Sequence, residues 1–417
     1  MNKEITVNNA DGMSLQNQIA ILQLLQRAGC LTRTQLADNT GLTQAAVSKI
    51  TAQLIAAGVI EETGLLTGRK GRRSIGLGIV DGGCKVIGVK LSRRNYAVGV
   101  FSLSGQLLEK VKGELSPGTD SKQMMVDIRK AVLGFLDKYQ EIAALGAAVP
   151  GPYLMKEKRI LLISELDMQA RRDIDLSTLF KGKAFEKLPI VFSHDANAGA
   201  MADWWFDIED RKFSGSIVHF LVGEGVGAGV VSNGTVFAGA KGTAAEIGHV
   251  SIDHQGPTCV CGNRGCLEMY CSSLAFVQQA EEKRKAHPDS LLNEMENLTP
   301  KAIFDAARRG DSLAIQCVKD VAYYIGLGCV NIINCYNPNT ILICNQMAQG
   351  GEMLLTEVKQ VVKQRIIPYL YEQVAIHLSR FGGDDILFGA AAVAIDYCLR
   401  HPDTLRDPGH QDRRNDK

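Results

Sequence analysis

Four side chains that can bind a metal ion lie close together in the middle of the sequence. Cys259, Cys261 and Cys266 fall within eight positions, and His249 lies ten residues before the first of them. Three thiolates and one imidazole make a complete tetrahedral ligand set for zinc and leave no open position for a reacting water. The spacing therefore predicts a structural zinc ion that fixes a loop. A chance cluster of buried thiols is one alternative, and a disulfide is another, which the lack of a secretory pattern disfavours.

The residues around this cluster resemble a known family. Residues 227–253 read G-A-G-V-V-S-N-G-T-V-F-A-G-A-K-G-T-A-A-E-I-G-H-V-S-I-D, and residues 259–268 read C-V-C-G-N-R-G-C-L-E. Together they resemble the ROK family of repressors, uncharacterised open reading frames and sugar kinases, and weaker similarity extends over nearly the whole chain. The resemblance implies an actin-like (ribonuclease H-like) α/β body of two lobes, with the zinc loop at residues 249–268 beside a sugar pocket.

The resemblance also implies a set of sugar-binding residues. Asp195 matches the acid that serves as the base in ROK kinases, and Glu246, His249 and Glu268 match residues around the sugar ring. Carboxylates and imidazoles suit a neutral polyol, because each can form hydrogen bonds with a pair of hydroxyl groups. We therefore expect these four side chains to form the sugar pocket.

Two of these acids have a second interpretation, and the sequence departs from the family at the edge of the pocket. Asp195 could instead cap the helix that follows it, and Glu268 could pair with Arg264. His194 stands where the family has asparagine. Glu165 lies in a segment where the family has a pocket-edge asparagine and a tryptophan. These changes leave open whether the altered pocket still binds the family's usual ligand.

The three nucleotide loops of a ROK kinase are altered in this sequence. Lys90 replaces the acid of the first loop, which resembles D-x-G-G-T in the kinases, and a cation cannot bind magnesium. Ser92 and Arg93 replace the glycines that let backbone N–H groups approach phosphate. Glu224 replaces a threonine in the second loop, and the third ends in Cys-Asn at Asn345 instead of Gly-Gly. Phosphoryl transfer depends on these groups, so we expect no kinase activity.

The elements expected to position these residues alternate between strands and helices. Short apolar runs predict strands, and longer segments with helical periodicity predict helices. Strands are expected at residues 86–91, 96–103, 145–149, 190–192 and 217–222, and helices at 124–139, 312–333, 353–366 and 389–399. Polar residues follow several of the strands, which is typical of an α/β protein that binds its ligand in a crevice at the strand ends.

The N-terminal residues predict a separate winged helix-turn-helix module. Helices are expected at residues 15–28, 33–37 and 43–57, followed by strands at 59–62 and 74–77 that flank a basic hairpin. The third helix of such a module presents its first residues to base edges in the DNA major groove. The residues expected to contact DNA are Thr43, Gln44, Ala45, Ser48 and Lys49 on this helix and Arg69, Lys70, Arg72 and Arg73 on the wing. A three-helix module that binds protein is the alternative, but the head also resembles the DNA-binding end of ROK repressors.

Charge and length support a division into domains. The 417 residues carry a net charge of +1, but residues 1–75 hold eight basic and five acidic residues, a net charge of +3. A mildly basic head on a near-neutral body fits a DNA-binding module joined to a sensor. The chain is too long for one compact core. We expect a DNA-binding domain at residues 1–80, a sugar-sensing body at 81–400 and a disordered, charged tail at 401–417.

Cysteine usage and hydropathy indicate the compartment. The eleven cysteines are scattered and odd in number, which indicates free thiols in a reducing environment. The first residues lack the basic-then-apolar pattern of a signal peptide. Uninterrupted apolar runs stay shorter than the roughly 18–20 residues that a membrane span needs. The sequence therefore predicts a cytoplasmic protein without a membrane partner.

These features together favour a transcriptional regulator, most simply a repressor of carbohydrate-use genes. The expected partners are operator DNA, a sugar or sugar-phosphate effector, and further copies of the chain in a homodimer or homotetramer. A sugar would shift the population between two lobe arrangements, one of which binds DNA. Two alternatives remain: a ROK sugar kinase with an added DNA-binding head, and a regulator that a partner protein switches.

Overall fold

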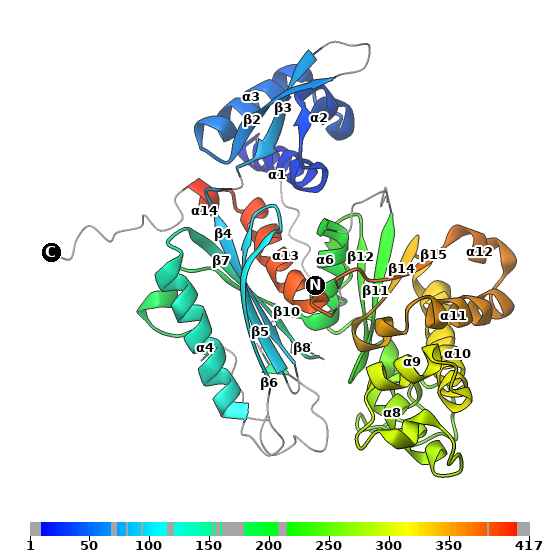
Figure 1. Cartoon of the computed structure of the whole chain (residues 1–417). Coiled ribbons are helices and arrows are strands. Elements are labelled where there is room, and N and C mark those ends of the chain that lie inside the picture. Colours follow the sequence, from blue (N-terminus) through cyan, green and yellow to red (C-terminus); the bar gives the residue numbers. More distant parts are fainter. Residues whose placement is uncertain are drawn as a thin grey trace.

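The chain folds into a small N-terminal head and a larger body of two lobes (Figure 1). The computed structural model describes residues 10–67, 73–80, 82–92, 95–114, 121–151, 153–154, 159–160, 179–206, 215–381 and 383–406. Helices and strands alternate through the body, and the head precedes it in the sequence. This agrees with the fold predicted from the sequence.

The head packs helices against a three-stranded sheet of order β1-β3-β2. Its elements are α1 (Ala10–Ala28), β1 (Leu31–Thr32), α2 (Arg33–Thr40), α3 (Gln44–Ala56), β2 (Ile60–Thr67) and β3 (Arg73–Ile79). The predicted capping box is present, because the Thr32 hydroxyl accepts from the Gln35 backbone N–H and the Gln35 side chain accepts from that of Thr32. Thr43 caps α3 by accepting a hydrogen bond from the backbone N–H of Ala46.

Lobe one is built on a five-stranded sheet of order β10-β7-β4-β5-β6. Its strands are β4 (Lys85–Leu91), β5 (Asn95–Ser102), β6 (Leu107–Glu114), β7 (Ile142–Val149) and β10 (Ile190–His194), with short elements β8 (Tyr153–Leu154), β9 (Arg159–Ile160) and η3 (Lys183–Phe185). Strands β4, β5 and β6 pair antiparallel, whereas β7 and β10 run parallel to β4. Ile87 and Val89 face the core beneath α4 (Ser121–Lys138), and Val86 faces the opposite core. Both faces of this sheet are therefore covered.

Lobe two repeats the same arrangement, with the order β13-β12-β11-β14-β15. Its strands are β11 (Ser216–Val222), β12 (Val226–Ser232), β13 (Thr235–Val236), β14 (Thr340–Cys344) and β15 (Ala375–Leu378). Its helices are η4 (Ile247–His249), α7 (Glu268–Cys271), α8 (Ser273–Arg284), η5 (Leu291–Glu294), α9 (Pro300–Arg308), α10 (Ser312–Tyr336), η6 (Asn345–Gly350), α11 (Gly351–Arg365) and α12 (Pro368–Gln373). As in lobe one, three antiparallel strands are extended by two parallel ones.

Two helices, α6 (Asp195–Phe206) and α13 (Asp385–Arg400), lie between the two sheets (Figure 1). Helix α13 packs on β4 and β7 of lobe one, and α6 packs on β11 and β12 of lobe two. Each helix lies very close to the strands on which it packs. A side chain at Gly146 of β7 would collide with the carbonyl oxygen of Ala390, and one at Gly229 of β12 would collide with that of Ala196. Each helix is thus fixed to the sheet of one lobe.

The structure corrects the sequence analysis near the C-terminus. The last long helix begins at Asp385, not at residue 389, and its buried first turn reaches the space between the lobes. A further helix, α14 (Asp403–Arg406), lies in the segment predicted to be disordered, because Leu405 is 4% exposed in a core shared with the head and α13. Residues 407–417 and Glu165 lie outside the described residues. Strand β12, in the glycine-rich segment after β11, was not among the strands expected from the sequence.

Helix α10 is the one helix in the described part of the chain that is long and apolar enough to cross a membrane. Just over half of its most apolar stretch is buried within the body. Its buried residues, such as Val321 and Ile325, belong to the core of lobe two. A core helix passes the same test of length and composition, so α10 is weak evidence for a membrane span.

Candidate functional site

A pocket opens between the two lobes, where several strands end. All four predicted sugar-binding residues line it, namely Asp195, Glu246, His249 and Glu268. The pocket is open to solvent, and its empty space is about 800 Å³ when the solvent at its mouth is included. The structure thus brings together side chains that lie up to 73 positions apart in the sequence, from Asp195 to Glu268.

His194 and Asp195 form a pair where β10 meets α6. His194 Nε2 lies 3.0 Å from Asp195 Oδ1, and the same oxygen accepts a hydrogen bond from the Ala196 N–H at 2.7 Å. Asp195 therefore sits at the start of α6, where a carboxylate stabilises the helix, and it also lines the pocket. Its two interpretations are compatible.

His194 has one ring nitrogen that the described residues leave without a hydrogen-bond partner. Its side chain is buried at the pocket wall, and its Nδ1 has no hydrogen-bond partner among the described residues. Burial opposes protonation of His194, but the carboxylates of Asp195 and Glu246 outweigh it and raise the pKa of His194 above its usual value. The imidazole is therefore biased toward its charged form.

Glu246 is positioned by an unusual backbone conformation. Ala245, just before it, has a φ of 63°, a left-handed conformation that is rare for a residue with a side chain. Glu246 Oε1 is buried without a hydrogen-bond partner among the residues that the structure describes. Burial is the main cause that raises the pKa of Glu246, and the negative charges of Asp195 and Glu268 add to it. A ligand hydroxyl would satisfy this oxygen.

Glu268 is held by the turn between β11 and β12. Its Oε2 accepts a hydrogen bond from the Val226 N–H at 2.8 Å, and the side chain is 9% exposed. The structure thus gives Glu268 a backbone partner in place of the alternative pairing with Arg264. One carboxylate oxygen positions the side chain, and the residue lines the pocket.

The four predicted zinc ligands converge beside this pocket. One ligand atom from each of His249, Cys259, Cys261 and Cys266 lies within 4.8 Å of all the others. His249 Nδ1 lies 3.6 Å from Cys259 Sγ, and the Sγ atoms of Cys261 and Cys266 are also 3.6 Å apart. Tetrahedral zinc with bonds of about 2.1–2.3 Å to nitrogen and sulfur spaces its ligand atoms roughly 3.6–3.8 Å apart. The donor set and the spacing therefore fit zinc.

The backbone around the cluster connects it to the pocket. The Cys259 N–H donates to the Asn263 carbonyl at 2.8 Å, and Ser251 forms a β-bridge with Cys266. The next hydrogen bond, from the Leu267 N–H to the Val250 carbonyl, lies one residue before Glu268. A metal ion that orders this loop would consequently also fix Glu268 at the pocket wall.

Residues that the sequence analysis assigned to altered nucleotide loops line the same pocket. They are Lys90 and Ser92 at the end of β4, Glu224 between β11 and β12, and Asn345 after β14. Asn345 has a φ of 69°, and its side chain lies against Gly223, where an added Cβ would be 2.6 Å from Asn345 Oδ1. The asparagine thus covers the glycine-rich turn. Arg93 lies outside the described residues.

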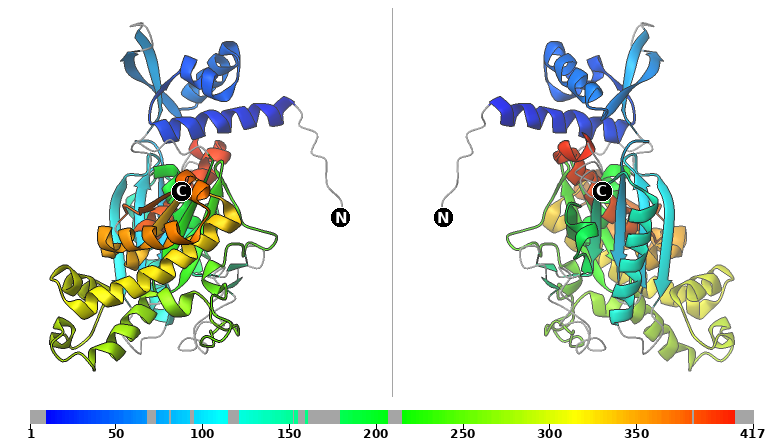
Figure 2. Two further views of the ribbon diagram at one scale, coloured as in Figure 1. Left: turned by 90° about the vertical axis from the view of Figure 1, so that its right-hand side faces the viewer. Right: turned by 90° about the vertical axis from the view of Figure 1, so that its left-hand side faces the viewer.

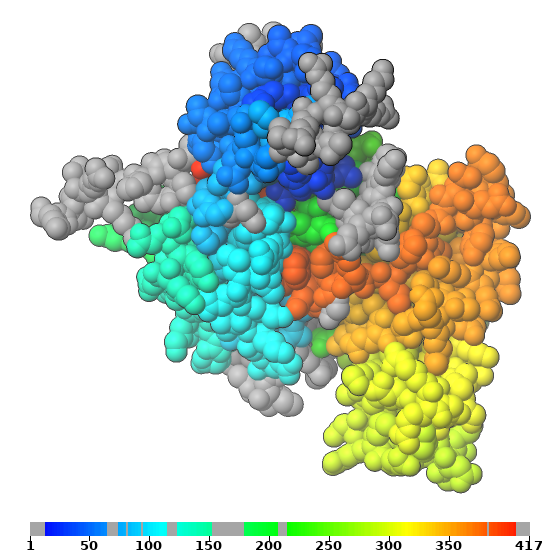
Figure 3. All heavy atoms as spheres, turned by 45° about the horizontal axis from the view of Figure 1, so that its top comes forward, coloured from blue at the N-terminus to red at the C-terminus, as the bar shows by residue number. Residues whose placement is uncertain are grey.

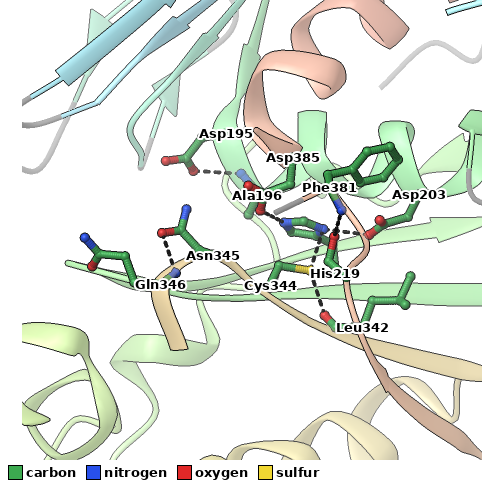
Figure 4. A network of polar contacts seen from close by, with 11 residues as sticks. Asp195, Ala196, Asp203, His219, Leu342, Cys344, Asn345, Gln346, Phe381 and Asp385 are labelled. Carbon is green, nitrogen blue, oxygen red and sulfur yellow. Dashed lines mark hydrogen bonds and ion pairs between the residues drawn. The ribbon is translucent and has the colours of Figure 1, made fainter. Parts of the chain in front are cut away.

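A second polar cluster lies behind the pocket, between α6, α13, β11 and β14 (Figure 4). His219 Nδ1 lies 2.6 Å from Asp203 Oδ2 and 3.1 Å from Cys344 Sγ, and His219 Nε2 lies 3.4 Å from Asp385 Oδ2. All four side chains are buried. The 2.6 Å contact is a hydrogen-bond distance, shorter than the spacing of two ligands on one metal ion. The cluster therefore joins four elements through hydrogen bonds and ion pairs.

The predicted DNA-contacting residues of α3 share one exposed surface. Thr43, Gln44, Ala45, Ser48 and Lys49 are all exposed, whereas Val47 and Ile50 between them are buried. The first turn of α3 is therefore accessible to a partner. Of the predicted wing residues, Arg69, Lys70 and Arg72 lie outside the described residues, and Arg73 is described only as part of the β3 backbone.

Sequence reasoning missed several residues at the site. Ile386 lines the pocket because α13 begins earlier than its periodicity indicated. Asn95 and Gln346 also line it, and both are polar residues next to a strand end. His219 carried a readable signal, since a histidine within the apolar run of β11 must find buried partners.

Known proteins match both parts of the chain. The ROK family model matches residues 86–397, and a model of winged helix-turn-helix DNA-binding domains matches residues 15–61. The xylose repressor of Caldicellulosiruptor bescii is 28% identical over 394 residues, which cover 93% of this chain and 97% of that protein. The N-acetylglucosamine repressor of Escherichia coli O157:H7 is 28% identical over 366 residues, which cover 87% and 88%.

A solved structure confirms the fold. The crystal structure of a ROK family transcriptional regulator, a homologue of the Escherichia coli MLC protein, superposes with a TM-score of 0.75 at 24% identity. The match covers 95% of this chain and all of that one. It includes the head as well as both lobes. The predicted two-lobed actin-like body with an N-terminal winged helix-turn-helix is therefore confirmed.

Proposed function

Because this chain belongs to the ROK family and carries a winged helix-turn-helix head, we propose that it is a transcriptional repressor of carbohydrate-use genes. A sugar in the pocket between the lobes lowers the affinity of the head for operator DNA. One observation carries the proposal: a single chain combines a winged head whose third helix exposes its first turn with a pocket between two lobes that is lined by Asp195, Glu246, His249 and Glu268. The relatives named for xylose and N-acetylglucosamine repression support it.

The head, residues 1–80, binds DNA through α3 and the wing. Gln44 can form two hydrogen bonds with adenine, Ser48 can bond a base edge or a phosphate, and Lys49 can bond guanine or a phosphate. Their exposure on one face of α3 supports this assignment. The wing cations Arg69, Lys70, Arg72 and Arg73 would neutralise phosphates without reading sequence. Recognition helices usually act in pairs on half-sites, so we expect a homodimer or homotetramer.

The body, residues 81–400, binds the sugar. Two pocket-lining residues, Glu246 and His194, each carry a buried polar atom without a partner among the described residues, and sugar hydroxyl groups would satisfy these atoms. Carboxylates outnumber cations on the wall, where Lys90 faces an excess of acids that includes Glu224. A phosphate dianion would be repelled by such a wall, whereas a neutral polyol would not. We therefore favour an unphosphorylated sugar over a sugar phosphate.

Zinc has a structural role in this proposal. His249, Cys259, Cys261 and Cys266 would hold the ion, which would supply a closed tetrahedral anchor for the loop. His249 Nδ1 faces Cys259, and the residue also lines the pocket. In this proposal the other ring nitrogen, Nε2, would form a hydrogen bond with the sugar. Glu268 follows the last cysteine by two residues and shares the anchor.

Sugar phosphorylation is the competing activity, and the site disfavours it. Lys90 occupies the place of a magnesium-binding acid, Glu224 would repel a γ-phosphate, and Asn345 covers the glycine turn that would approach the nucleotide. Asp195 then acts as a hydrogen-bond acceptor for a sugar hydroxyl rather than as a base. The protein would be a cytoplasmic sensor and not an enzyme.

Genome-wide footprinting of the protein on DNA tests the proposal. Sites should lie upstream of genes for sugar uptake and breakdown, and occupancy should fall when the corresponding sugar is supplied. Sites scattered at random, or near unrelated genes, would contradict it. Occupancy that follows the level of another protein and ignores every sugar would favour the alternative of a regulator that a partner protein switches.

A further inference from the structure

Helix α1 of the head lies across the ends of α6 and α13 (Figures 1 and 2). The guanidinium carbon of Arg27 lies 4.1 Å from the centre of the Trp204 ring, in the last turn of α6. One helical turn earlier on α1, Gln23 Nε2 donates to Asp396 Oδ1 of α13 at 3.5 Å. In the space-filling view the dark-blue atoms of α1 lie directly against the body (Figure 3).

These two contacts reach different lobes. Trp204 belongs to α6, which packs on β11 and β12, and its ring also lies against the Gly234 turn of lobe two. Asp396 belongs to α13, which packs on β4 and β7 of lobe one. Residues four positions apart share one face of a helix. One face of α1 therefore contacts lobe two through Arg27 and lobe one through Gln23.

The two body helices also connect this contact to the pocket. Each begins at the pocket wall, α6 with Asp195 and α13 beside Ile386. They approach each other closely near those starts, where a side chain at Gly389 would collide with the backbone of Ala198. If the lobes turn about this contact, which is close to the pocket, the far ends of α6 and α13 move further than their starts. Helix α1 packs against those far ends.

A buried side chain on the same helix lacks hydrogen-bond partners in this position of the head. Gln26 is 8% exposed, and neither polar atom of its amide has a hydrogen-bond partner among the described residues. Burying an amide without partners costs free energy. A rotation of α1 that gave Gln26 a partner would recover part of that cost.

We propose that α1 is the element through which the head senses the relative position of the two lobes, with Arg27 and Gln23 as positioning residues. The inference rests on the proposed function, because it names the route from a sugar between the lobes to the operator. Helix α1 contacts α2 and β3 within the head, and α2 contacts α3. When the ends of α6 and α13 move apart or together, α1 turns and carries the recognition helix with it.

The first test measures the coupling between sugar and operator in the full chain. Coupling is the ratio of operator Kd with and without saturating D-xylose or N-acetyl-D-glucosamine, whichever binds the parent in calorimetry. We expect the parent to show a ratio of about 5–150, the usual size of allosteric effects. Arg27→Ala should bring the ratio to within about twofold of 1, while each ligand alone keeps its parental affinity to within about threefold.

Two matched variants sharpen this test. Arg27→Lys keeps a cation over the Trp204 ring and should retain part of the coupling. Lys138→Ala removes a cation at the end of α4, away from α1, that lies 5.5 Å from the ring of Tyr139. This variant should keep the parental ratio. A parental ratio in both Arg27→Ala and Gln23→Ala would overturn the inference. A parent that responds to no sugar would contradict the proposed function instead, and the second test then decides.

The second test uses tryptophan emission and needs no sugar. The two tryptophans of the chain, Trp204 and Trp205, both lie in α6. Binding of a DNA duplex that the protein has selected from a random pool should change their emission in the parent, because α1 moves on the Trp204 ring. Arg27→Ala should bind the same duplex with little or no change in emission. Unchanged emission in the DNA-bound parent would overturn the inference.

Discussion

His219 Nδ1 lies 2.6 Å from Asp203 Oδ2, and both side chains are fully buried between the two lobes (Figure 4). Burial alone would lower the pKa of His219, but the surrounding polar side chains outweigh it and raise that pKa well above its usual value. Cys344 and the carboxylates of Asp203 and Asp385 are those neighbours. These neighbours favour the imidazolium form, which would join α6, α13 and lobe two through ion pairs.

His219→Gln should lower the free energy of unfolding by about 3–5 kcal/mol, because it leaves buried carboxylates without their cation. A raised pKa stabilises the fold fully below the unfolded-state value, and the stabilisation is lost as pH rises through the folded-state value. The difference in free energy of unfolding between parent and variant, measured with urea, should therefore be largest at about pH 6 and shrink at alkaline pH. His287→Gln, at an exposed histidine, is the control. An equal difference at every pH would contradict a charged His219.

The zinc assignment predicts one equivalent of metal per chain. Cys261→Ser should lose the metal and loosen the loop, because a closed tetrahedral site tolerates no missing ligand. Elemental analysis of the purified protein measures the content. Cys335→Ser removes an exposed thiol outside the cluster and should keep the full equivalent. Full metal content in the Cys261 variant would show that the cluster is not the site.

The altered nucleotide loops predict that the protein does not phosphorylate sugars. A coupled assay for ADP release across hexoses and pentoses should remain at background with ATP and magnesium. Turnover that disappears in Asp195→Asn would establish a kinase, because that change removes the base while the pocket keeps its shape.

The recognition helix predicts a sequence-specific effect of Gln44. Gln44→Ala should cost roughly 1–3 kcal/mol of operator binding and relax the base preference at one position. Gln53→Ala, exposed further along α3, should leave both unchanged. Selection of binding sites from random duplexes measures the preference. Identical base preferences for the parent and Gln44→Ala would show that Gln44 of α3 does not contact the bases.

Much of the fold and of the site was predictable because local chemistry specified it. The capping box of Thr32 and Gln35 requires only neighbouring residues, and the candidate metal ligands lie within one short stretch of the chain. The start of α13 could not be read in the same way. Its first turn is held by burial between two sheets, and that burial depends on strands about 170 to 300 residues earlier in the chain. The contact of Arg27 with Trp204 is likewise tertiary and leaves no local pattern.

The central claim is that a sugar in the pocket changes operator affinity, and Glu246 tests it most directly. Glu246 lines the pocket, far in sequence from the head, and its buried Oε1 has no hydrogen-bond partner among the described residues. A ligand shifts an equilibrium only by its differential affinity for the two states. Glu246→Gln replaces one carboxylate oxygen, which accepts hydrogen bonds, with an amide NH2 group, which only donates them, so the shift should weaken. The matched variant Glu352→Gln removes a carboxylate from the first turn of α11, away from the pocket lining.

The decisive measurement is operator Kd in the parent, Glu246→Gln and Glu352→Gln, each with and without the sugar that binds the parent. We predict equal operator affinity for all three without sugar. At the sugar concentration that releases the parent, Glu352→Gln should also be released, whereas Glu246→Gln should stay bound. Release of Glu246→Gln at the parental sugar concentration would contradict the account.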